Sequence, residues 1–138
     1  MKRLLIASLM ALTSSQVFSM DSLADLGWKN RVVLVFGNAG DQKVARQVKV
    51  LEARKAELAE RDMVVIRVSR EEASSAYGNI PALDPVNLRK DAKIAGDAFH
   101  VVLVGKDGGI KLRSEDIVGD VEIFDLIDSM PMRRAERK

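Results

Sequence analysis

The chain has 138 residues, of which 47% are hydrophobic and 30% charged, a composition typical of one globular domain. It contains no cysteine, which excludes disulfide bonds, thiol catalysis and thiolate metal sites. It also contains a single histidine, His100, too few imidazole ligands for an ordinary zinc site.

Residues 1–19 are typical of a secretory signal peptide. Lys2 and Arg3 form a short basic region, residues 4–12 form an apolar stretch too short to span a bilayer comfortably, and cleavage is expected after Ser19. The alternative is an N-terminal helix that packs on the domain. The pattern favours a periplasmic or secreted protein, with a domain at residues 20–138 and no integral membrane segment after cleavage.

Cleavage would also change the charge of the protein. The formal net charge of the whole chain is +2, but removing Lys2 and Arg3 from the 22 basic residues leaves 20, equal to the 20 acidic ones. A neutral domain offers no electrostatic basis for binding nucleic acid. The basic residues of the tail, 133–138, are expected to be solvated and frayed.

The first half of the domain reads as strand, helix, strand. A lead-in at residues 21–30 offers Leu23, Leu26 and Trp28 to cover an edge of the core. Residues 31–36 form a continuous apolar run with β-branched side chains, which predicts a buried strand.

A long helix is predicted over residues 41–61, with Asp41 as its cap. Its apolar stripe consists of Val44, Val48, Leu51 and Leu58. Residues 63–68 form a second apolar run, so the three segments predict a right-handed βαβ unit with parallel strands.

The second half begins with an irregular stretch, residues 69–87. Asp84 and Pro85 are a typical helix start, and they predict a short helix to about residue 94 with Leu88 and Ala92 turned inward.

A third apolar strand is predicted at residues 100–104, followed by a tight turn at 106–109 and an edge strand at 110–113. The last helix is expected at about residues 120–130, where Pro131 closes it. Its apolar face consists of Ile123, Phe124, Ile127 and Met130.

This order, βαβ and then ββα, predicts an α/β fold: a single domain with a central mixed sheet flanked by helices, which is the thioredoxin-like arrangement.

Four stretches of the chain resemble one family. They are WKNR (28–31), ERDMVV (60–65), LVGKDGGIKLR (103–113) and IDSMPMR (127–133). Through them the chain resembles the domain of unknown function (DUF) 4174 family, a thioredoxin-like group, over nearly all of the mature domain. The resemblance implies the fold and an exported location, and it does not imply an activity.

The stretch VVLVFGNAGD (32–41) lies where a thioredoxin-like protein carries its catalytic C-x-x-C, after the first buried strand and at the start of a helix. No sulfur is present there. The proline expected before the third core strand is also missing, since Ala98, Phe99 and His100 occupy that place. Thiol–disulfide exchange and cysteine peroxidase chemistry are therefore excluded.

Other ligand motifs are absent as well. Gly37 and Gly40 do not have the spacing of a phosphate-binding loop, and Asp41 would repel an anion. The turn GKDGG lacks the calcium-loop pattern, and no G-x-S-x-G nucleophile motif occurs. No cofactor or metal is predicted. An anion patch of Arg67, Arg89 and Arg113 competes with ordinary surface ion pairing, which is the favoured interpretation.

Two groups of candidate site residues remain. The vestigial active-site corner consists of Gly37, Asn38, Ala39, Gly40, Asp41 and His100. The family-motif turn consists of Gly105, Lys106, Asp107, Gly108, Gly109, Lys111 and Arg113. The favoured function is non-catalytic binding of an envelope or extracellular protein, with the partner and the oligomeric state undetermined. The alternative is a non-thiol enzyme that uses Asp41 and His100 as an acid–base pair.

Overall fold

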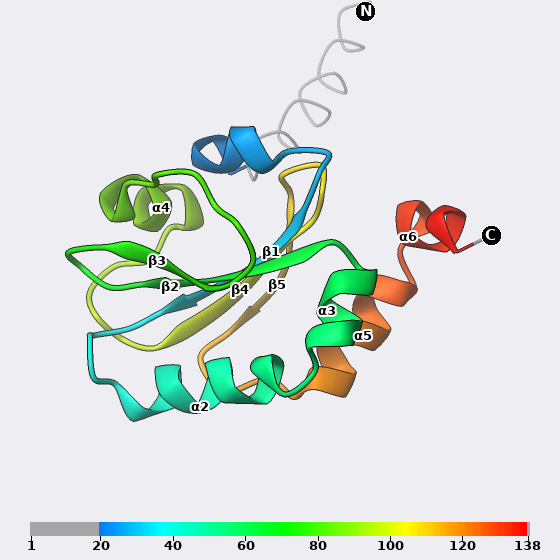
Figure 1. The fold of residues 1–138 in the computed structure, drawn as a ribbon. Coiled ribbons are helices and arrows are strands. Elements are labelled where there is room, and N and C mark those ends of the chain that lie inside the picture. The colour runs from blue at the N-terminus through cyan, green and yellow to red at the C-terminus, as the bar shows by residue number, and fades with distance from the viewer. Residues whose placement is uncertain (1–19, 138) are drawn as a thin grey trace, which may run out of the picture.

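A computed structural model describes residues 20–137 (Figure 1). The signal peptide predicted at residues 1–19 and the last residue of the tail lie outside the described residues.

The centre of the domain is a five-stranded sheet in the order β3-β2-β1-β4-β5. The strands are β1 (Arg31–Phe36), β2 (Met63–Val68), β3 (Ala73–Tyr77), β4 (His100–Val104) and β5 (Ile110–Ser114). Strands β1 and β2 are parallel, whereas the pairs β1–β4, β2–β3 and β4–β5 are antiparallel. The α/β fold with a mixed sheet flanked by helices is thus confirmed.

Strand β1 is buried along its whole length because both faces of the sheet are covered. Val33 and Val35 face one apolar core, which helices α2 (Gln42–Glu52), α3 (Lys55–Glu60) and α5 (Asp120–Asp128) cover. Val32, Leu34 and Phe36 face a second core, which α4 (Pro85–Ala92) and the 3₁₀ helix η3 (Asp21–Leu26) cover. Figure 1 shows these helices as two layers on opposite faces of the sheet.

The prediction of a single long helix over residues 41–61 is wrong. The chain forms α2 (Gln42–Glu52) and α3 (Lys55–Glu60), separated where Arg54 leaves helical geometry with φ −124° and ψ 48°. Both halves of the predicted apolar stripe are nevertheless buried. The sequence carries neither glycine nor proline at this break, so no local signal announces it.

The segment expected to be irregular contains strand β3. Its sequence, ASSAY, has only one residue that favours strands, so pairing with β2 and not local propensity decides its conformation. Helix α4 begins as predicted, with the Asp84 side chain accepting a hydrogen bond from the Val86 amide. Leu88 and Ala92 are fully buried, also as predicted.

The two ends of the domain differ from prediction. Leu23 and Leu26 are buried as expected, but Trp28 is 68% exposed and does not cover the core. Helix α5 (Asp120–Asp128) is followed by a further helix, α6 (Pro131–Glu136), which Pro131 begins. The basic tail is therefore not frayed throughout, and Arg133 within α6 is only 3% exposed.

Candidate functional site

The corner between β1 and α2 is a compact loop. The Gly37 amide donates to the carbonyl of Val68, which ties the loop to the end of β2, and the Asp41 amide donates to the carbonyl of Asn38. Gly40 has φ +94°, a conformation that glycine adopts without strain. The loop thus has the geometry of a turn that delivers the chain into a helix.

Asp41 caps α2 as predicted. Its side chain accepts a hydrogen bond of 2.7 Å from the amide of Lys43, so one of the unpaired donors at the start of the helix is satisfied. This carboxylate occupies the place where a helix dipole would otherwise attract an external anion.

A shallow hollow of about 150 Å³ lies beside this loop. One wall is the loop itself, from Gly37 to Gly40, and the other comes from the end of β2, the β2–β3 turn and the start of β3. The side chains on that second wall belong to Arg67, Val68, Ser69, Glu72 and Ser74. The hollow combines backbone groups, the apolar side chains of Val44 and Val68, and two opposite charges.

His100 does not join this hollow. It lies opposite Phe36 in the β1–β4 ladder, and residues directly opposite in antiparallel strands point to the same face of a sheet. Phe36 belongs to the core under α4, whereas α2 and its cap Asp41 lie on the other face. The sheet therefore separates Asp41 from His100.

The contacts of His100 agree with this placement. Its Nδ1 lies 3.3 Å from the carbonyl of Ala98, and its Nε2 lies 3.9 Å from Oε2 of the exposed Glu115. Within residues 20–137, no hydrogen bond or ion pair joins His100 to Asp41. The pair thus lacks the hydrogen-bond geometry of an acid–base dyad in this structure.

The family-motif turn between β4 and β5 is closed by two backbone bonds, from the Gly105 amide to the carbonyl of Gly109 and from the Gly108 amide to that of Gly105. Asp107 accepts from the Gly109 amide and lies 3.0 Å from the Lys111 ammonium. Burial tends to raise the pKa of Asp107, but these two donors outweigh it and lower the pKa.

The same turn also anchors the start of the domain. The amide of Met20 donates to the carbonyl of Gly108, and the amide of Trp28 donates to that of Lys106. Arg113, the last residue of the motif, reaches across to the carbonyl of Ala92 at the end of α4. The turn residues therefore hold neighbouring segments in place, and Lys106 has a further role.

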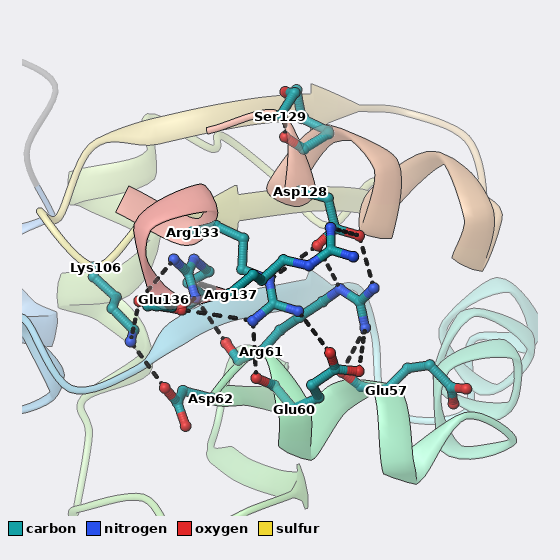
Figure 2. Close-up of polar contacts among 12 residues, drawn as sticks. Glu57, Glu60, Arg61, Asp62, Lys106, Asp128, Ser129, Arg133, Glu136 and Arg137 are labelled. Atoms are coloured by element: carbon teal, nitrogen blue, oxygen red, sulfur yellow. Dashed lines mark hydrogen bonds and ion pairs between the residues drawn. The ribbon is translucent and has the colours of Figure 1, made fainter. Parts of the chain in front are cut away.

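A cluster of buried cations and more exposed carboxylates lies at the end of the sheet opposite the corner. We call it the charge cluster, and it consists of Arg31, Glu60, Arg61, Asp62, Lys106, Asp128, Arg133 and Glu136. Figure 2 shows most of its members pointing toward one another from α3, α5, α6 and the β4–β5 turn. Four cations face four anions, so the cluster is formally neutral.

Two carboxylates organise the charge cluster. Asp128 accepts from Arg61 at 2.8 and 3.0 Å and from Nε of Arg133 at 3.0 Å. Glu136 accepts from Arg31 through both oxygens and from the Lys106 ammonium at 2.8 Å. Each carboxylate is therefore shared by two cations.

These contacts shift the pKa of each carboxylate in the same direction. Burial tends to raise the pKa of Asp128, but hydrogen bonds from Arg61 and Arg133 hold it below its ordinary value. Burial acts in the same way on Glu136, and Lys106 and Arg31 likewise lower its pKa.

The pKa of Lys106 shifts in the opposite direction. Burial tends to lower its pKa, but hydrogen bonds to Glu136 and to Asp62 raise it. The guanidinium of Arg61 also lies 4.6 Å from the ring centre of Phe124, which gives this buried cation a second kind of partner.

The sequence pattern did not single out the charge cluster, because its members are far apart in the chain and only folding brings them together. One signal was present. Arg31 is the first residue of β1, Arg61 and Asp62 come directly before β2, and Lys106 follows the end of β4 closely. Each therefore lies at the end of a buried strand.

Residues 20–137 contain no group of three or more histidine, aspartate or glutamate side chains that could hold a metal ion. In the same part of the chain, no helix combines the length and the apolar character needed to cross a bilayer. Cysteine is absent from the entire sequence.

Comparison with known proteins identifies the family. Residues 22–136 match the model of a domain of unknown function, DUF4174. The chain belongs to this family. No curated protein matches the chain.

The structure explains what the four stretches that resemble the DUF4174 family do in the fold. Each contributes to the charge cluster: Arg31 from WKNR, Arg61 from ERDMVV, Lys106 from LVGKDGGIKLR, and Asp128 with Arg133 from IDSMPMR. Because cations and anions pair within the cluster, its geometry is that of a structural tie between α6, α3 and the sheet. The hollow at the corner remains the better candidate for an external contact.

Proposed function

We propose that this DUF4174 protein is an exported, non-catalytic domain that binds an extended segment of a partner protein in the cell envelope or outside the cell. The observation that carries the proposal is the position of the corner hollow, which opens beside the first residues of an uncharged edge strand, β3.

The two edges of the sheet differ in character. Strand β5 carries Lys111 and Arg113, and charged side chains on an edge strand discourage pairing with another chain. Strand β3 carries no charge between Ala73 and Tyr77. An edge strand presents unpaired backbone groups, so β3 is the edge better suited to receive an added strand.

The hollow adds a place for a side chain of the partner. Ser74 of β3 lines it together with Arg67 and Glu72. In strand addition, backbone hydrogen bonds supply affinity and pockets for alternate side chains supply specificity. A hollow beside β3 therefore offers both elements of this recognition mode.

A non-catalytic role is supported by the chemistry available at the corner. The protein has no thiol, Asp41 serves as the helix cap, and the sheet separates Asp41 from His100. A thioredoxin-like fold is supported by the order β2-β1-β4-β5, with a parallel central pair followed by an antiparallel hairpin.

Affinity capture from the protein's own envelope extract, followed by mass spectrometry, tests the binding proposal. Ser74→Lys places a charge on β3 and in the hollow, so it should abolish capture of the partner. Ser114→Lys makes the same change on β5 and should leave capture intact. Melting curves of both variants show whether they fold.

Hydrogen exchange of the captured complex locates the contact. Amides of residues 73–77 should exchange more slowly in the complex than in the free protein. Equal capture by the two variants, or protection only at other elements, would overturn the proposal for β3.

Export is supported by the sequence of residues 1–19 and is tested separately. Cell fractionation and intact mass measurement should find the protein in the periplasm or the medium without these residues. A full-length protein confined to the cytoplasm would contradict export without bearing on the contact at β3.

A further inference from the structure

Arg89 stands out among the arginines of the domain. It lies in the last turn of α4, where its Nη1 donates a hydrogen bond of 2.6 Å to the carbonyl of Gly96. Its other two nitrogens, Nε and Nη2, are buried without a hydrogen-bond partner. Within residues 20–137, these are the only buried side-chain nitrogen or oxygen atoms in that condition.

The unpaired atoms form one functional unit. Nε and Nη2 lie on the same side of the planar guanidinium and point their hydrogens in the same direction. This side matches two oxygens of one carboxylate or phosphate group. A buried charged donor without an acceptor is costly, so this arrangement favours an acceptor supplied from outside the chain.

The surroundings of Arg89 give such a group room. A hollow of about 220 Å³ is lined by Arg70, Val86, Arg89 and Gly96. It adjoins the end of β2. It shares no lining residue with the corner hollow, although Ser69 of that hollow is next to Arg70 in the chain.

The local charge also suits an anion. The carboxylate of Asp97 pairs with Nε of Arg70 at 2.5 Å, and no recorded contact joins it to Arg89. Arg70 and Arg89 line the hollow with positive charge, whereas Asp97 and Glu71, the carboxylates near Arg70, are not among its lining residues. Because the Arg70 side chain is 62% exposed, it stands at the mouth of the hollow and not in its floor.

We propose that this hollow is an oxyanion-binding site. Nε and Nη2 of Arg89, which are closed off from solvent in this structure, turn into the hollow to bind a carboxylate or phosphate group, and Arg70 assists at the mouth. Val86, 63% exposed, provides an apolar contact beside the charged group. The anion is carried by a small acid, a phosphate compound or an acidic residue of a partner. All three kinds of ligand present two oxygens bonded to one carbon or phosphorus atom.

Nuclear magnetic resonance titration of the protein tests the site directly. Sodium acetate, sodium phosphate and, as the ionic control, sodium chloride are added at matched ionic strength. Acetate or phosphate should shift the Nε–H signal of Arg89 and the backbone amide of Gly96 in a saturable manner. Chloride should not reproduce these shifts.

Three variants separate the site from general attraction of anions. Arg89→Gln removes the charge, Arg89→Lys keeps the charge but lacks the two-pronged geometry, and Arg46→Gln removes an exposed arginine from α2. Both Arg89 variants should bind the responsive anion at least about tenfold more weakly, as expected for loss of a charged bidentate contact. Arg46→Gln should bind it normally.

The two anions identify the ligand class. A response to acetate alone indicates carboxylates, a response to phosphate alone indicates phosphates, and a response to both indicates a general oxyanion site. Non-saturable shifts that match those of chloride, or equal binding by wild type and Arg89→Lys, would overturn the proposal. If Arg89→Gln does not fold, the wild-type titration and Arg89→Lys still decide the matter.

Discussion

Arg31 and Glu136, 105 residues apart in the chain, face each other in a two-pronged ion pair with both N–O distances at 3.2 Å. Arg31 opens the central strand β1 and is 2% exposed, while Glu136 ends the last helix, α6. One contact thus joins the beginning of the sheet to the C-terminal helix.

This pair predicts a large loss of stability for Glu136→Ala. The substitution leaves Arg31 buried with only the carbonyl of Arg61 as a recorded partner and deprives Lys106 of one of two carboxylates. We expect a loss of about 3 kcal/mol, the lower end for a broken buried pair because the Glu136 side chain is 26% exposed. Thermal or urea unfolding measures it.

Arg134→Ala is the matched control, since Arg134 lies on the same helix and is exposed. Its effect should stay within about 0.5 kcal/mol. Equal losses in the two variants would mean that the charge cluster does not hold α6 in place.

The second prediction concerns acid. Asp128 and Glu136 have lowered pKa values in the folded protein, so the unfolded chain binds more protons than the folded one as the pH falls. Their contribution to stability is complete above the ordinary carboxylate pKa of about 4 and disappears as the pH drops through the lower folded values. Melting temperatures measured from pH 7 to pH 2 should show this decline.

Asp128→Asn provides the comparison. At pH 7 it should melt below the wild type, because Arg61 and Arg133 lose their shared carboxylate. The difference should narrow as the pH falls below about 4, because the unfolded wild-type chain then takes up a proton at Asp128 and the folded protein does so only at still lower pH. A gap that stays constant down to pH 2 would show that Asp128 does not stabilise the fold through its charge.

Asp41 and His100 yield a third prediction. Asp41→Ala should cost about 1 kcal/mol through loss of the cap on α2, as should Asp84→Ala at the start of α4. Asp41→Asn keeps a capping oxygen and should be nearly neutral. If the protein is a binding domain, Asp41→Asn and His100→Ala should both retain partner capture.

Loss of function in either of these two variants, with an unchanged melting curve, would favour the enzyme alternative. The functional readout is partner capture for binding and any measured turnover for catalysis.

Two glycines give a fourth prediction. Gly78, at the end of β3, has φ +91°, and an added methyl group would lie 2.7 Å from Cγ1 of the buried Val64. Gly78→Ala should therefore cost about 1–3 kcal/mol from crowding and backbone strain together. At Gly105 the nearest atom, at 2.6 Å, is the flexible end of Lys111.

Because the Lys111 side chain can move aside, Gly105→Ala should be milder than Gly78→Ala. Chemical denaturation of both variants tests the order. The reverse order would show that the β4–β5 turn is more rigid than its contacts indicate.

The sequence predicted the central strands well because their signal is local. Residues 31–36, 63–68 and 100–104 are apolar runs in which only Arg31, Arg67 and His100 are polar, and each is a largely buried strand in the structure. Strand β3 escaped prediction because alanine and serine carry little strand preference and an edge strand needs a neighbour to define it. The break at Arg54 has no local signal, whereas Pro131, which was interpreted as the end of one helix, is the start of the next.

The candidate site was predicted in part. The loop at Gly37 and the cap at Asp41 follow from the spacing of a strand end and a helix start. The position of His100 did not follow, because the face to which a strand residue points depends on register with its partner strand. For Arg67, Arg89 and Arg113 the sequence favoured ordinary surface ion pairing over an anion patch. In the structure Arg67 donates to the carbonyl of Ser75 and Arg113 to that of Ala92 at the end of α4, while Arg89 keeps two nitrogens unpaired.

The sequence by itself determined the α/β class, the buried strands, the caps of α2 and α4 and the absence of thiol chemistry, since these depend on residue type and short-range periodicity. Only the tertiary structure decided that Arg31, Lys106, Asp128 and Glu136 share one charge cluster, that the sheet separates Asp41 from His100, and that Arg89 keeps an unpaired edge. These outcomes depend on which distant segments meet, and charge pairing over such separations leaves no pattern along the chain.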